Sequence, residues 1–258
     1  MHAPVELADI AADVVERIKS RAPKVHCITN SVAQNYTANI LLAAGAVPSM
    51  TISSEEIAAF VASADALLVN LGTFDAERRA AIEAALEAAG QGKKPGSQKP
   101  WVLDPVFIER SAARAAFAGK LIAHRPTVVR LNHREFAALT GDAAETAQGF
   151  ALTHKTVIAV TGGSDLVTDG RRSVTVSNGD ALMSVVTAMG CAGSALVAAA
   201  LAVEPDPWLA TNAALIAFGV AGEVAAKSAP APGRFASWII DALYTLDRAT
   251  LRAHARVS

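Results

Sequence analysis

The chain has 258 residues, 52% of them hydrophobic, and its 23 lysines and arginines nearly balance 24 aspartates and glutamates, for a formal net charge of -1. This balance, without a dense basic patch, argues against nucleic acid or an anionic membrane as a partner. Cys27 and Cys191 lie far apart and form neither a CxxC motif nor a disulfide framework, which argues against a secreted domain held by disulfides.

Residues 1–20 carry acids at helical spacing and lack the basic and apolar regions of a signal peptide. Apolar runs such as 196–203 are too short to cross a bilayer. We therefore predict a soluble cytoplasmic protein, and because a chain of this length commonly forms one α/β core, a single domain over residues 1–258.

Strand-like and helix-like segments alternate from the N-terminus. A helix over 1–20 is followed by a strand over 24–29 and by a helix over 31–45 that Gly45 closes. Ser53 and Glu56 have the spacing of a capping box at the start of a helix over 53–64. The predicted elements after it are a strand at 65–72, a helix at 75–90, a solvated loop at 93–100 and strands at 101–105, 127–132 and 156–162.

The predicted strands are apolar throughout, as expected for parallel strands covered by helices on both faces. Their alternation with helices predicts a doubly wound α/β fold. Asp169-Gly170 lies between β-rich runs and predicts a hairpin within 165–179. From residue 192 the chain is predicted to be helical to its end, with interruptions at 204–208 and 228–234.

Polar residues follow each of these strands, and the carboxyl ends of parallel strands are where open α/β sheets bind ligands. We therefore predict a ligand site at this edge. The residues that mark it are Thr29-Asn30, Asn70 to Thr73, Asp104-Pro105, Arg130 to Asn132 and Thr161 to Gly163.

The stretch "VVTAMGCAGSAL", residues 185–196, is the most distinctive part of the sequence. Strand-like residues 185–187 run through Ala188-Met189-Gly190 into an alanine-rich helix, whose first N–H groups would bind an anion. Cys191 would have its thiolate stabilised there. The alternative is that Cys191 is a small buried hydrophobic residue, as most free cysteines are.

Seven segments follow one another along roughly residues 25–235: "VHCITNSVAQNYTANILLAAGAVPSM", "LLVNLGT", "VLDPV", "RLNHREF", "VIAVTGGSD", "TAMGC" and "APGRF". In these segments, and in their order, the chain resembles the hydroxyethylthiazole kinase family of the ribokinase-like superfamily. The resemblance implies a ribokinase-like three-layer fold with a mostly parallel central sheet. It also implies Mg²⁺- and ATP-dependent phosphorylation of the primary hydroxyl of 4-methyl-5-(2-hydroxyethyl)thiazole in thiamine salvage, by a homotrimer whose active site lies at a subunit boundary.

The resemblance also implies roles for individual residues. Cys191 matches the catalytic cysteine, and Met189 and Gly190 belong to the anion hole. The ATP contacts are Arg130 and Thr161, the substrate contacts are Met50, Ala188, Asn30 and Gly72, and the acidic positions near Mg²⁺ are Asp104 and Glu135.

Several of these residues also have a purely structural interpretation. Glu135 with Asn132 suits a helix cap, Asp104 before a proline suits a turn, and Met50 suits a core position. Asn30 has the position of a helix cap as well.

The chain departs from the family pattern at Ala188-Met189, usually Gly-Ala, and at 106–110, usually rich in Gly and Ala. If φ at residue 188 is positive, an alanine there is costly. These departures leave open a kinase of another small heteroaromatic alcohol, or a protein that binds nucleotide or thiazole without turnover.

Overall fold

The computed structural model describes residues 4–90, 98–141, 145–229 and 231–258. Of the predicted loop at 93–100, residues 93–97 lie outside these ranges. Eight strands form one sheet in the order β2-β1-β3-β4-β5-β6-β7-β8. The strands are β1 (Lys24–Ile28), β2 (Val47–Ser49), β3 (Ala66–Asn70), β4 (Trp101–Asp104), β5 (Val128–Asn132), β6 (Val157–Thr161), β7 (Asp165–Thr168) and β8 (Ser173–Val176).

The strands from β2 to β6 pair in parallel, and the hairpin of β7 and β8 adds antiparallel pairs at one edge. Parallel pairing follows from the sequence because each central strand is apolar on both sides of the pleat. Within β3, Leu68 packs into one core cluster while Leu67 and Val69 pack into the other. The predicted parallel sheet and the predicted hairpin are both confirmed.

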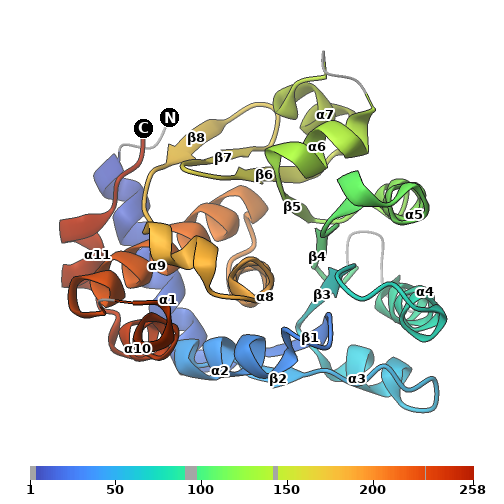
Figure 1. The fold of residues 1–258 in the computed structure, drawn as a ribbon, viewed down its shortest axis with the longest axis horizontal. Coiled ribbons are helices and arrows are strands. Elements are labelled where there is room, and N and C mark those ends of the chain that lie inside the picture. The colour runs from blue at the N-terminus through green and yellow to red at the C-terminus, as the bar shows by residue number, and fades with distance from the viewer. Residues whose placement is uncertain (1–3, 91–97, 142–144, 230) are drawn as a thin grey trace.

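Helices cover both faces of the sheet, which gives three layers (Figure 1). One layer holds α1 (Pro4–Arg21), α2 (Gln34–Ala44), α8 (Met189–Leu201), α9 (Pro207–Ser228), α10 (Pro232–Thr245) and α11 (Arg248–His254). The other holds α3 (Ile57–Ser63), α4 (Ala76–Gly90), α5 (Ala112–Ile122), α6 (His133–Thr140) and α7 (Ala147–His154). Two 3₁₀ turns lie in loops that follow strands: η1 (Ile108–Arg110) comes after β4, and η2 (Ala181–Val185) comes after β8.

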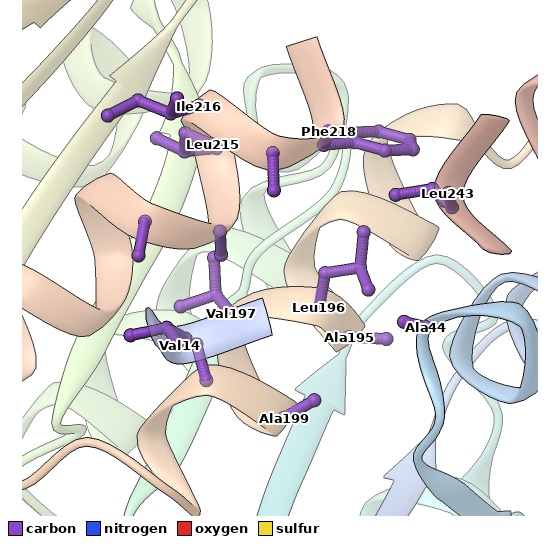
Figure 2. Packing of buried hydrophobic residues seen from close by; sticks show 14 of the residues in the cluster. Val14, Ala44, Ala195, Leu196, Val197, Ala199, Leu215, Ile216, Phe218 and Leu243 are labelled. Carbon is purple, nitrogen blue, oxygen red and sulfur yellow. The ribbon is translucent and has the colours of Figure 1, made fainter. Parts of the chain in front are cut away.

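Helix α9 lies at the centre of its layer and packs against α1, α8 and α10. Among the helices of the described ranges it alone is long and apolar enough to span a membrane, but 78% of its most apolar window is buried inside the protein. Figure 2 shows why: Leu215 and Phe218 of α9 belong, with Leu196 of α8, to one cluster of buried apolar side chains. The helix α9 is therefore long and apolar because it is a buried core helix.

Three local predictions are wrong. The chain is not helical to its end, because α10 ends at Thr245 and Val257 forms an antiparallel β-bridge with Val176. The Ser53–Glu56 capping box does not form, because α3 begins only at Ile57 and the Glu56 carboxylate accepts the Thr51 hydroxyl instead. The strand-like run at 185–187 is not a strand: Val185 ends η2 and is 61% exposed, so it has no place in the sheet. In addition, the short edge strand β2 was not predicted from the sequence.

Gly45 ends α2 as predicted, in the left-handed region with φ of 95°. The N–H of Gly45 donates to the Leu42 carbonyl and that of Ala46 to the Leu41 carbonyl, which is the Schellman pattern. A Cβ at this position would lie 2.8 Å from the Lys19 Cα. Both backbone strain and a steric clash therefore oppose any side chain here.

We predict that Gly45→Ala lowers the free energy of unfolding by about 1–3 kcal/mol. The matched control is Gly119→Ala in the exposed middle of α5, where an added Cβ meets nothing within 4 Å. That substitution should raise the free energy of unfolding by roughly 0.5–1 kcal/mol, since alanine favours a helix. Urea unfolding of both variants measures the contrast, and equal effects of the two would contradict it.

Candidate active site

Two adjoining cavities open at the carboxyl edge of the sheet, of about 590 Å³ and 620 Å³. The first extends over the ends of β1, β3, β4 and β5 to the start of α8. The second extends from β6 over the η2 segment to α9. The residues that line both are Arg130, Asn132, Thr161, Met183, Ser184, Met189 and Gly190. The two cavities therefore meet where β5 faces the start of α8.

The sheet register brings polar residues from neighbouring strand ends side by side. Asn70 is paired with Asp104 across β3 and β4, and Asn132 with Thr161 across β5 and β6. Ten of the eleven residues predicted for the site line the first cavity: Asn30, Gly72, Asp104, Arg130, Glu135, Thr161, Ala188, Met189, Gly190 and Cys191. Met50 does not line it; this half-buried side chain packs against the core.

Helix α8 begins at this edge with an unusual backbone. Ala188, which precedes its first turn, has φ of 68°, so the condition under which alanine is costly there is met. In the described part of the chain, Ala192 is the first residue of this turn whose N–H reaches a carbonyl, that of Ala188. The N–H groups of Met189, Gly190 and Cys191 come before it and remain available to an anion in the cavity.

Arg130 joins β5 to this helix start. Its Nη1 donates to the Gly190 carbonyl at 2.9 Å and to the Ser194 hydroxyl at 3.4 Å. A Cβ on Gly193 would lie 3.3 Å from Nη2, so the small residues of α8 make room for the guanidinium. The Nε of Arg130 is buried and has no acceptor among the described residues. A buried donor without an acceptor favours an anionic ligand beside it.

Asp104 is almost completely buried at the end of β4. Its Oδ2 accepts hydrogen bonds from the Asn70 side-chain amide at 2.7 Å and from the Ser194 hydroxyl at 2.8 Å. Burial raises the pKa of Asp104 to about 6, with Glu135 adding to the rise and Arg130 opposing it. The carboxylate is therefore charged at neutral pH, but its charge is costly to hold.

A chain of hydrogen bonds connects Asp104 with Cys191. Asn70 donates to Asp104 and accepts from the Asn30 amide at 3.2 Å, and Asn30 also donates to the Cys191 Sγ at 3.2 Å. Gly72 lies against this chain, since a Cβ there would meet the Asn30 side chain at 2.6 Å. Glycine is required here because a neighbouring side chain approaches the backbone closely.

The expected thiolate at Cys191 is not found. Burial and the charge on Asp104 together raise the pKa of Cys191 to about 11, against the opposing effect of hydrogen bonds from Asn70 and Asn30. The residue is therefore a thiol at neutral pH. The sequence pattern located the helix start and the acidic Asp104 at the same edge, but it did not indicate that Asp104 lies close enough to raise the pKa of the thiol.

Glu135 forms the predicted helix cap. One carboxylate oxygen accepts the Asn132 N–H at 2.8 Å while the Asn132 side chain accepts the Glu135 N–H, a complete capping box. The other oxygen accepts the Phe107 N–H at 2.9 Å. The carboxylate thus fixes the loop after β4, and the same side chain also lines the first cavity.

Asn70 and Ser194 both contact Asp104. Ser194 was not predicted for the site, and Asn70 was predicted only as one of the polar residues at the strand ends, with no role of its own. Asn70 was visible as one polar residue at a strand end, and its full burial next to an acidic strand end was the missing sign. Ser194 lies in the middle of an alanine-rich helix, where a serine by itself predicts no role. Its position four residues after Gly190 places it one turn further along the same helix face.

The sequence model that matches the chain is that of the hydroxyethylthiazole kinase family, over residues 15–249. Curated hydroxyethylthiazole kinases from Rhizobium etli and Cereibacter sphaeroides are each 43% identical to the chain. The alignment with the first covers 95% of this chain and 99% of that protein, and with the second 94% and 96%.

Solved structures agree with this match. The structure of a hydroxyethylthiazole kinase protein from Pyrococcus horikoshii superposes with a TM-score of 0.91 at 36% identity, over 97% of this chain and 98% of that one. A ribokinase-like superfamily protein from Enterococcus faecalis has a TM-score of 0.68 at 14% identity, covering 92% and 95%, and shows the fold alone. The chain has a ribokinase-like fold and belongs to the hydroxyethylthiazole kinase family.

Proposed function

We propose that this protein transfers the γ-phosphoryl group of ATP to the primary hydroxyl of 4-methyl-5-(2-hydroxyethyl)thiazole, a step of thiamine salvage. The observation that carries the proposal is the meeting of two cavities at Arg130 and Gly190. A reaction between two bound molecules requires that their two binding sites join at the point where the reacting atoms meet. The names and lengths of the matched relatives support the same activity.

ATP occupies the second cavity, with its phosphates where this cavity joins the first, beside Arg130 and Gly190. Arg130 and the free N–H groups at the start of α8 supply positive charge there, which is what a transferring phosphoryl group needs. Thr161 ends β6 and lines this cavity together with Gly162 and Gly163. Met189 and Gly190, which line both cavities, form the anion hole between ATP and the alcohol.

Mg²⁺ fits the acidic residues of the first cavity. The described residues contain no cluster of three or more His, Cys, Asp or Glu side chains, but Mg²⁺ typically takes only one or two carboxylates together with phosphate oxygens and water. Asp104 Oδ1 accepts no hydrogen bond from any described residue, and Glu135 lies on the same wall. We propose Asp104 as the main ligand and Glu135 as its neighbour; the ion would neutralise phosphate charge.

The alcohol occupies the first cavity, near Asn30, Gly72 and the Ala188 backbone. Cys191 is proposed to orient the hydroxyl by accepting its hydrogen bond. The sulfur of a thiol already carries a proton and is not a base, so the hydroxyl proton of the alcohol is transferred to an oxygen of the phosphoryl group. A loose transition state allows this, because little positive charge develops on the hydroxyl before the new bond forms. The role of Cys191 in this scheme is mainly positional.

We further propose a homotrimer in the cytoplasm, as the family resemblance implies. An active site at a subunit boundary agrees with the position of Met50, which lies outside the cavity of its own chain. In such an assembly Met50 reaches the thiazole of a neighbouring subunit. The molar mass in solution, measured by light scattering, tests the trimer.

The function is tested by ADP release from ATP and Mg²⁺ with a panel of alcohols that includes the thiazole alcohol, a pyridoxal-like alcohol and a hydroxymethylpyrimidine. We expect the highest kcat/KM for the thiazole alcohol. A higher value for another member would assign the protein to that acceptor. Binding of both ATP and the thiazole alcohol without ADP release would show a protein without turnover.

Cys191→Ala should lower kcat by roughly ten- to a hundredfold, below the usual contribution of a general base, because a positioning thiol is lost. Cys191→Ser should retain more activity, since its hydroxyl still accepts a hydrogen bond. Steady-state kinetics at saturating ATP, with thermal unfolding as the control for the fold, checks both variants. Wild-type turnover in the alanine variant would remove Cys191 from the reaction, and a loss beyond about a thousandfold would indicate a thiolate base.

Replacing Ala188 by Gly and Met189 by Ala should raise kcat/KM for the thiazole alcohol. The left-handed backbone at Ala188 costs about 1 kcal/mol, which glycine relieves. Met189 lines both cavities, but its side chain is almost fully buried in the core, so the single Met189→Ala variant separates any room gained at the reactants from the packing that is lost. The double variant and each single variant are compared by kcat/KM. An unchanged or lower value in the double variant would show that the surrounding loops already compensate.

A further inference from the structure

Phe107 is a large apolar residue that lines the first cavity and not the second. It follows β4 by three residues and is 47% exposed. Val32, which is 72% exposed, and Val106 line the same cavity. The part of the cavity formed by the loops after β1 and β4 therefore presents apolar surface to whatever binds there.

The backbone at Phe107 is held in a strained conformation. Its φ of 57° and ψ of 29° lie in the left-handed region, where a bulky side chain is a clear outlier. Three hydrogen bonds keep it there: the Phe107 N–H donates to Glu135 at 2.9 Å, the Phe107 carbonyl accepts the Arg110 N–H at 3.1 Å, and Arg114 Nη1 donates to the Val106 carbonyl at 2.8 Å. Strain fixed by its surroundings in this way is typical of functional loops.

Packing within the chain does not explain this conformation, because the side chain remains about half exposed. The Arg110 guanidinium lies 4.8 Å from the ring centroid, a cation–π contact that keeps the ring in place from one side. These contacts hold the aromatic ring of Phe107 in one position at the first cavity. Asn30 and Cys191, which are proposed to receive the hydroxyl, line the same cavity.

We propose that the ring of Phe107 stacks against the flat ring of the acceptor, which makes Phe107 a specificity-determining residue for heteroaromatic alcohols. This inference rests on the proposed function, since it places the alcohol in the first cavity. Aromatic pairs gain affinity beyond the area that they bury, whereas a saturated ring of similar size gains only from burial. The first cavity would therefore distinguish aromatic from saturated alcohols as well as larger from smaller ones.

The test compares Phe107→Leu with the wild type for two alcohols, the thiazole alcohol and 2-cyclopentylethanol, by calorimetric binding and by steady-state kinetics. Loss of the stacking contact should raise the dissociation constant of the thiazole alcohol roughly three- to tenfold. The dissociation constant of 2-cyclopentylethanol and the KM for ATP should change less than about twofold, since neither depends on the stacking contact. Phe107→Tyr, which keeps the ring, should bind the thiazole alcohol as the wild type does.

Phe136→Leu is the matched control, because Phe136 is half-buried on α6 and lines neither cavity. Equal losses for both alcohols, a raised KM for ATP or unchanged binding would each overturn the inference. Phe107→Met replaces the leucine variant if that variant fails to fold. Binding is measured without turnover, so a wild type that binds the thiazole alcohol but does not phosphorylate it would refute the proposed function and still test the stacking.

Discussion

The burial of one carboxylate, Asp104, sets the arrangement of this site. Its Oδ2 is held from β3 by Asn70 and from α8 by Ser194, so that a strand and a helix from distant parts of the sequence are fixed to the end of β4. A carboxylate inside a protein requires hydrogen-bond donors and a nearby positive charge. The neighbouring elements supply both, and they become the walls of the cavities in doing so.

The positive charge comes from Arg130 and from the start of α8, and it serves a second purpose. Arg130 donates to the Gly190 carbonyl and the Ser194 hydroxyl, which holds the first turn of α8 at the point where the cavities meet. The free N–H groups of that turn would then stabilise a phosphoryl group during transfer. On this account the network is incomplete without phosphate and Mg²⁺, because the Arg130 Nε and Asp104 Oδ1 have no acceptor or donor among the described residues.

The sequence predicted what depends on local pattern. The apolar strands, the Gly45 helix end, the Asn132–Glu135 cap and the hairpin at Asp169-Gly170 each follow from residues close together in the chain. It failed where partners come from elsewhere: the Thr51 hydroxyl takes Glu56 away from a cap, and the short strand β2 contains a proline. The thiol at Cys191 and the importance of Asn70 and Ser194 depend on their distance from Asp104, which no single-sequence pattern contains.

The central claim, that Asp104 is kept charged at a cost to stability, is tested most directly by Asp104→Asn. The folded-state pKa of about 6 lies above the ordinary value of 3.8, so the charge destabilises the fold increasingly as pH rises through that range. In EDTA at pH 8, the account predicts that Asp104→Asn raises the free energy of unfolding by up to about 3 kcal/mol, and by about half as much at pH 5. In a separate assay with Mg²⁺ and ATP, the variant should lose phosphoryl transfer. A variant that is no more stable than the wild type at pH 8, or equally favoured at both pH values, would contradict the account.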